Sequence, residues 1–308
     1  MNIIPIKKIE PGDTIGLFSS SSPTNENSVN NIKDYFEKRG YIVKTSSHIY
    51  KSNGYMAGNA KERADDLNEL VEDDSVKLIM TANGGKSALQ MLPYIDYERI
   101  RKKQKGIIGL SDPSILLNAV TVKSGVITLH GPNGYNFGES QITKFSEKNW
   151  WDIVTGKQTE IGFGTDATVI KGNRDVTGRL YGGHLGTIRN LIGTEWEPDW
   201  NSCILFLEEA FSDISLFDTM LTHLKYCGVF EKIHGLVVGK LEQCYESNYS
   251  VIESLQEIIL RNCEEYDFPI IMDAWIGHTD DKVTLPIGAM GKLCLSGVKL
   301  DLIQKYAC

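Results

Sequence analysis

The sequence has no cysteine before residue 203, and none of its six cysteines forms a Cys-x-x-Cys pair. This spacing disfavours a metal site of neighbouring thiolates and a disulfide framework, and indicates free thiols in a reducing compartment. No run of about 18 apolar residues is present, so we expect no membrane span. The first eight residues lack the basic, apolar and small-residue order of a secretion signal, so we expect a cytoplasmic protein.

The chain also lacks a basic patch, and its formal net charge is −8, which argues against nucleic acid as the main partner. Hydrophobic residues make up 41% and charged residues 23%, a balance that excludes a disordered or fibrous chain. The length of 308 residues predicts two domains of roughly 100–200 residues each. For the assembly, we keep a homodimer as a hypothesis.

The first 130 residues alternate strand-like and helix-like segments. Largely apolar strands alternating with helices predict an α/β fold, with a parallel sheet covered by helices on both faces. Ligands bind beyond the carboxyl ends of such strands. Four segments follow strands at that edge: residues 19–22, Asn83-Gly84-Gly85, Ser111 and His130. Strands are expected at 13–20, 41–45, 76–81, 106–110 and 126–129, and helices at 28–39, 61–72, 87–92 and 115–122.

The segment 138–177 is less periodic and reads as a connector between domains. We therefore expect an N-terminal α/β domain over 1–140, a connector over 141–170, and a C-terminal α/β domain over 171–308. Further strands are expected at 203–207, 235–238, 270–272, 282–285 and 292–296. Helices are expected at 214–226 and in the segment that follows residues 178–185 and ends at about residue 191.

Ser111 stands between an apolar strand and an apolar helix-like run, in Gly-Leu-Ser-Asp-Pro. A serine on such a turn exposes its hydroxyl beside a helix N-terminus, as in a serine hydrolase. The usual second glycine is replaced by Pro113, which the first turn of a helix accepts. The alternative is that Ser111 only caps the helix.

A serine hydrolase needs a histidine base and an acid that orients it. His278, in Gly-His-Thr-Asp, and His130, after a strand, are near-equal candidates, and either could be a structural histidine. Glu208 and Glu209 follow four apolar residues, where a buried carboxylate needs a partner; both could instead solvate the next loop.

The glycines of Asn83-Gly84-Gly85 could offer backbone N–H groups to an oxyanion, together with the amide of Asp112; the alternative is a tight turn. Lys86 and the helix after Ser111 could attract a substrate carboxylate or phosphate. The chain has neither the GxxxxGK[ST] nor the GxGxxG pattern, so a nucleotide-phosphate loop has no support.

An ordered set of motifs resembles the LD-carboxypeptidase family of serine peptidases, which includes muropeptide-recycling enzymes and microcin C immunity peptidases. The set runs over most of the chain: GDTIGLFSSSSP, GYMAGNAKERADDL, TANGG, LPYIDY, GLSDPS, HGP, GRLYGGHL, ILFLEE and GHTDDKVTLPIG. The resemblance implies an N-terminal flavodoxin-like parallel-sheet domain, a second C-terminal α/β domain, and an active site in the cleft between them. It also implies a cofactor-free and metal-free Ser-Glu-His triad of Ser111, Glu208 and His278, with the amides of Gly85 and Asp112 as oxyanion donors.

The chain departs from the muropeptide-recycling pattern in two segments that the resemblance places along the substrate cleft. Asn83-Gly84-Gly85-Lys86-Ser87 stands where Arg-Gly-Gly-Tyr-Gly is common, and His184 replaces the asparagine of Gly-Gly-Asn-Leu. LPYIDY and GHTD with TLPIG are more similar to the microcin-immunity branch. The expected substrate is a small peptide or peptidyl-nucleotide with a free carboxylate. The candidate substrate-binding residues are Asn83, Gly84, Lys86, His130 and His184.

Two further hypotheses stay open. A non-catalytic α/β module that binds a small ligand in the cleft would leave Ser111 inert. Stacking of Trp150, Trp151 or Trp196 on a nucleobase would favour a nucleotide substrate, whereas tryptophans near a domain boundary more often pack in a core.

Overall fold

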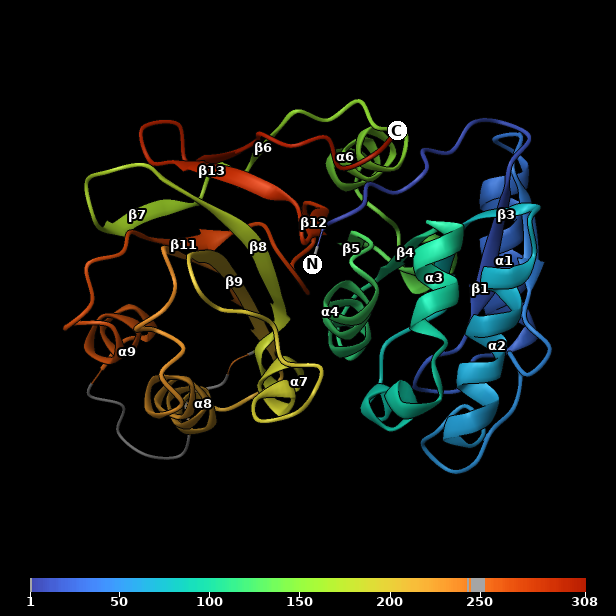
Figure 1. Ribbon diagram of the computed structural model, residues 1–308, viewed down its shortest axis with the longest axis horizontal. Coiled ribbons are helices and arrows are strands. Elements are labelled where there is room, and N and C mark those ends of the chain that lie inside the picture. The colour runs from blue at the N-terminus through green and yellow to red at the C-terminus, as the bar shows by residue number, and fades with distance from the viewer. Residues whose placement is uncertain (1, 243, 245–252) are drawn as a thin grey trace.

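The computed structural model describes residues 2–242, 244 and 253–308, and these residues form two sheets with helices around and between them (Figure 1). The first sheet has the order β12-β5-β4-β3-β1-β2 and the second the order β6-β14-β13-β8-β9-β10-β11-β7. The first sheet comprises β1 (Thr14–Phe18), β2 (Ile42–Thr45), β3 (Val76–Thr81), β4 (Gly106–Gly109), β5 (Thr128–His130) and β12 (Leu285–Ile287).

Strands β1 to β5 of the first sheet are parallel and take the flavodoxin-like order 2-1-3-4-5. The residues of β1, β3, β4 and β5 are almost entirely buried, because helices pack on the sheet, whereas the edge strand β2 is partly exposed. The prediction of an N-terminal flavodoxin-like domain is therefore confirmed. The covering elements are α1 (Glu26–Glu37), α2 (Ala60–Glu72), a 3-10 helix (Ala88–Tyr94), α3 (Tyr97–Lys103), α4 (Pro113–Ser124) and α5 (Gly134–Gly138).

The second sheet is mixed, with β8 to β11 parallel and the remaining strands antiparallel to their neighbours. It forms the second α/β domain that the sequence predicts. Its strands are β6 (Glu160–Gly162), β7 (Thr168–Lys171), β8 (Val176–His184), β9 (Cys203–Ala210), β10 (Gly235–Glu242), β11 (Ile270–Ala274), β13 (Met290–Cys294) and β14 (Lys299–Leu302). Its helices are α7 (Leu185–Ile188), a 3-10 turn (Arg189–Leu191), α8 (Ile214–Tyr226) and α9 (Leu255–Asn262).

Helix α4 joins the two halves, and Figure 1 shows it between them. It is buried on nearly all sides, as expected for a helix that is apolar all round. The side chain of Asn118 donates to the carbonyl of Gly182 in β8 at 2.8 Å, and the Ser114 hydroxyl accepts from the amide of His184 at 3.1 Å. The helix that follows Ser111 is thus anchored on the strand that ends at His184.

Several elements differ from the sequence-based expectation, and two of them bear on the site. Residues 144–154 of the expected connector form helix α6 (Lys144–Val154), whose Trp150 and Trp151 pack on Phe36 and Tyr41 of the first half. These two tryptophans therefore serve packing. Strand β12 pairs antiparallel with β5, so the C-terminal half adds a strand to the first sheet. The domain boundaries at 140 and 170 stay a prediction. No helix in the described residues is long and apolar enough to cross a membrane.

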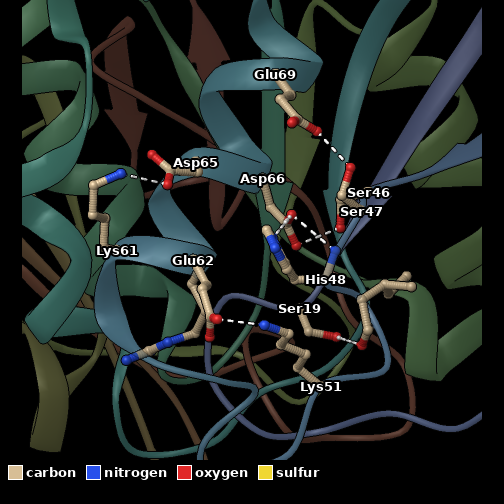
Figure 2. A network of polar contacts seen from close by, with 12 residues as sticks. Ser19, Ser46, Ser47, His48, Lys51, Lys61, Glu62, Asp65, Asp66 and Glu69 are labelled. Carbon is tan, nitrogen blue, oxygen red and sulfur yellow. Dashed lines mark hydrogen bonds and ion pairs between the residues drawn. The ribbon is translucent and has the colours of Figure 1, made fainter.

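A buried carboxylate fixes the segment after β2 to helix α2 (Figure 2). Asp66 is 1% exposed and accepts hydrogen bonds from the Ser46 hydroxyl at 2.7 Å, the His48 amide at 3.0 Å and the His48 ring at 2.8 Å. Its neighbour Asp65 pairs instead with Lys61 on the helix surface. One helical turn thus offers a buried and a surface carboxylate for comparison.

We expect Asp66→Ala to lower the free energy of unfolding by about 3 kcal/mol, because it leaves buried donors without an acceptor. Asp65→Ala, the matched control, should change it by less than about 0.5 kcal/mol, since exposed ion pairs contribute little. Urea unfolding followed by circular dichroism measures both. Equal effects of the two substitutions would contradict the structural role given to Asp66.

Candidate active site

Ser111 lies on a sharp turn between β4 and α4. Its backbone has φ of 71°, the left-handed region that residues other than glycine rarely adopt. Helix α4 begins two residues later, and the Ser111 carbonyl accepts from the Ser114 amide at 2.8 Å. Gly84 lies directly against it: a Cβ there would stand 3.1 Å from the Ser111 hydroxyl oxygen. The turn is therefore strained, as in a nucleophile elbow, and leaves the serine beside a bare backbone.

The carboxylate of Asp112 holds the neighbouring loop. It accepts from the amides of Ser87 and Ala88 at 2.7 and 2.8 Å and from the Ser21 hydroxyl at 2.5 Å. Arg63, which is fully buried, donates to Ser87 and to the carbonyl of Ser20. This network fixes the loop of residues 83–88 relative to the serine turn.

Gly85 cannot be replaced without moving this loop. Its φ is +148°, and a Cβ would stand 2.3 Å from the Ser21 hydroxyl oxygen. In the described part of the chain, neither the Gly85 nor the Asp112 backbone amide donates to a protein acceptor. The N–H group of each amide is therefore available to donate a hydrogen bond to a ligand.

Glu208 and His278 form a direct pair although they lie 70 residues apart in the sequence. The His278 Nδ1 lies 2.8 Å from the Glu208 Oε2, and the carboxylate is fully buried near the end of β9. Gly277 makes the approach possible, because a Cβ there would stand 2.4 Å from the same carboxylate oxygen. The His278 ring remains 20% exposed. The Nδ1 edge of the imidazole is thus bound to the acid, while another part of the ring is accessible at the surface.

The charges of this cluster depend on one another. Burial alone would raise the pKa of the Glu208 carboxyl, but the imidazoles of His278, His184 and His130 lower it to about 2. Burial alone would lower the pKa of His278, but the Glu208 carboxylate raises it above its ordinary value. Complete burial lowers the pKa of His130 to about 4. Near neutral pH, Glu208 is therefore ionised and His130 neutral.

The adjacent Glu209 has a different task. It accepts from the Gly186 amide at 2.9 Å and the Ser212 hydroxyl at 2.7 Å, and so fixes α7 and the loop after β9. His184 lies 3.4 Å from the same carboxylate. His130 is fully buried, with its Nε2 3.8 Å from Glu208. Among the described residues, no group of three or more His, Cys, Asp or Glu is arranged to hold a metal ion.

Ser111 and His278 line one open cavity of about 740 Å³ between the two halves. Of the five candidate substrate-binding residues, Asn83 and Gly84 also line it, whereas His130, His184 and the exposed Lys86 lie outside its lining. Substrate contacts for all five residues stay a prediction. The sequence reasoning missed the following lining residues: Asn133, Tyr135, Asn136, Ser140, Asp166, Phe211, Lys240, Trp275 and Lys282. Phe211, three residues after Glu208, and Lys282, four after His278, could have been found by following those motifs further.

Residues 15–131 match the model of the LD-carboxypeptidase N-terminal domain, and residues 177–293 match that of the C-terminal domain. The microcin C7 self-immunity protein MccF of Escherichia coli is 29% identical over 96% of this chain and 94% of its own. A Vibrio cholerae protein named "Putative carboxypeptidase" is 30% identical, over 93% of this chain and 94% of its own.

Solved structures agree with this relationship over the whole fold. MccF in complex with aspartyl sulfamoyl adenosine superimposes with a TM-score of 0.90 at 26% identity, covering 99% of this chain and 100% of that one. A muramoyltetrapeptide carboxypeptidase from Oxalobacter formigenes gives 0.82 at 25% identity, covering 94% and 97%. The chain therefore belongs to the LD-carboxypeptidase family of serine peptidases.

Proposed function

We propose that the protein hydrolyses an amide-type bond next to a free carboxylate, with Ser111, Glu208 and His278 as its catalytic triad. The observation that carries the proposal is the buried Glu208–His278 pair, whose imidazole lines the same cavity as the strained Ser111 turn. A module that only binds a ligand needs neither the strained serine nor the paired imidazole.

The hydrogen bond to Glu208 supports different roles for the two imidazole nitrogens. Because Nδ1 donates to the carboxylate, Nε2 is the nitrogen free to accept the Ser111 proton. The Ser111 oxygen then attacks the carbonyl carbon, and the amides of Gly85 and Asp112 stabilise the oxyanion. The resulting imidazolium, stabilised by Glu208, protonates the leaving nitrogen. Water, deprotonated by His278, hydrolyses the acyl-enzyme and restores the serine.

The relatives narrow the substrate class. MccF structures hold aspartyl sulfamoyl adenosine and glutamyl sulfamoyl guanosine, and another neighbour is a muramoyltetrapeptide carboxypeptidase. We propose a small peptidyl- or aminoacyl-nucleotide as the preferred substrate. The Asn83-Gly84-Gly85-Lys86 loop and His184 depart from the muropeptide-recycling pattern, and this supports the choice. The L,D bond of a murein tetrapeptide is the second candidate.

The test incubates the purified protein separately with an aspartyl-adenylate phosphoramidate and a murein tetrapeptide, and follows the products by mass spectrometry. We expect release of aspartate from the first at a kcat/KM at least about tenfold above that for terminal D-alanine release, a difference of 1.4 kcal/mol. The reverse order would select the murein substrate. If neither substrate is hydrolysed and a fluorophosphonate does not label Ser111, the hydrolase proposal is overturned and a ligand-binding module remains.

A further inference from the structure

Lys282 is a buried cation that the proposed mechanism does not use. The residue is only 7% exposed and lines the cavity that also contains Ser111 and His278. In the described residues, no carboxylate oxygen lies within 4 Å of its ammonium nitrogen, which donates only to the Asp280 carbonyl at 3.2 Å. An ammonium taken out of water without a close counter-ion is costly unless another anion approaches it.

The fold holds Lys282 at this place through helix α6. The Ser146 hydroxyl accepts from the Lys282 amide at 2.8 Å, and the Asn149 side chain accepts from the Thr284 amide at 2.6 Å. The Ser146 hydroxyl also lies 3.3 Å from the Asp280 carbonyl. The loop that carries His278 and Lys282 is therefore clamped at several points, so the two side chains keep a fixed relation.

Among the residues that the structure describes, no free carboxylate close to Lys282 compensates its positive charge. Burial is the main influence and lowers the pKa of its ammonium, while Asp280, Asp281 and Glu208 raise it. Asp281 is itself engaged by the Thr143 hydroxyl, and Glu208 by His278. The other lysine that lines the cavity, Lys240, pairs with Asp166 at 2.5 Å. Lys282 is thus the lining lysine whose charge is left for a ligand.

We infer that Lys282 binds the free carboxylate of the substrate and so determines which side chain or terminus the cavity accepts. The inference rests on the proposed function and deepens it. Lys86, the cation expected from the sequence for this task, is exposed and outside the cavity lining. Lys282 lies four residues from the imidazole and can fix the carboxylate while Ser111 attacks the neighbouring carbonyl.

The test compares two ligands that differ only in this group: aspartyl sulfamoyl adenosine and its asparaginyl counterpart, in which a carboxamide replaces the carboxylate. Binding is measured by calorimetry in the Ser111→Ala background, so that no turnover interferes. We expect Lys282→Met to lower the affinity for the aspartyl ligand by about 100-fold and that for the asparaginyl ligand by less than about threefold. Only the aspartyl ligand loses a charge-assisted hydrogen bond. Lys61→Met, at an exposed lysine that pairs with Asp65 and lies outside the cavity lining, is the control and should leave both affinities unchanged.

Equal losses for the two ligands, or no loss for either, would overturn the inference. A Lys282→Met protein with Ser111 intact should still react with a fluorophosphonate at the parent rate. Loss of that reaction would mean that Lys282 acts on the serine, which also overturns the inference. Failure of the proposed function gives a different pattern: the unmodified protein would hydrolyse neither substrate, while the charge-dependent difference between the ligands would persist.

Discussion

Ser111→Ala is expected to reduce kcat by about 10⁴-fold or more, because the proposed mechanism has no other nucleophile to form the acyl-enzyme. The substitution removes one oxygen and adds no atom at a turn where the Ser111 backbone already has φ of 71°. Oxyanion donors and substrate contacts would remain, so KM should change little. Steady-state kinetics on the better of the two candidate substrates measures the loss.

Ser140→Ala provides the matched control, because Ser140 lines the same cavity but has no contact with the Glu208–His278 pair. Its activity should stay within about threefold of the unmodified protein, as expected for a residue outside the reacting unit. If Ser111→Ala keeps more than about a tenth of the activity, the nucleophile is not Ser111, since knockouts of a reacting serine are far more severe.

The sequence predicted those parts of the site that follow from local order along the chain. Ser111 between an apolar strand and an apolar helix implies a turn at the carboxyl edge of a sheet, and the structure has it there. Glu208 after four apolar residues implies a buried acid that needs a partner, and the structure gives it His278. In both cases the pattern of a few neighbouring residues was enough.

The parts that were missed depend on contacts between distant segments. Strand β8 contains Gly178, Gly182 and Gly183, and glycines weaken strand propensity. They are needed there because a side chain would collide with β9, the residue before it or α4. Helix α6 was missed in an aperiodic stretch, yet it holds the loop of Lys282 from more than 130 positions away. No local pattern reports such a contact.

The choice between Glu208 and Glu209 illustrates the same limit at one position. Successive residues of a strand point to opposite faces, so one glutamate must face His278 and the other must face away. Which is which depends on where the loop of residues 277–284 crosses β9, and that is decided by α6 and by the glycine at 277. The family resemblance selects Glu208 as the orienting acid, and it is the Glu208 carboxylate that lies 2.8 Å from the His278 Nδ1.

Glu208→Gln is expected to reduce kcat/KM by about 10³- to 10⁴-fold and to move its acid limb to lower pH. The base must be neutral to accept the Ser111 proton, so activity rises as pH passes through the pKa of His278. Glu208 raises the pKa of His278 above its ordinary value, so the limb of the unmodified protein is displaced to higher pH. Removing the carboxylate lets burial dominate, and the pKa of His278 falls. The pH profile of kcat/KM measures both effects.

Glu209→Gln separates this effect from a general loss of structure at the end of β9. Glu209 holds the amide of Gly186 and the hydroxyl of Ser212, so its loss should loosen α7 and lower the melting temperature. Glu209 raises the pKa of His278 less than Glu208 does, and it has no hydrogen bond to the ring, so the acid limb should move much less. An equal displacement of the limb in the two variants would mean that His278 senses only the total negative charge nearby. The directed hydrogen bond from Nδ1 would then have no special part in catalysis, and the triad would reduce to a serine and a histidine.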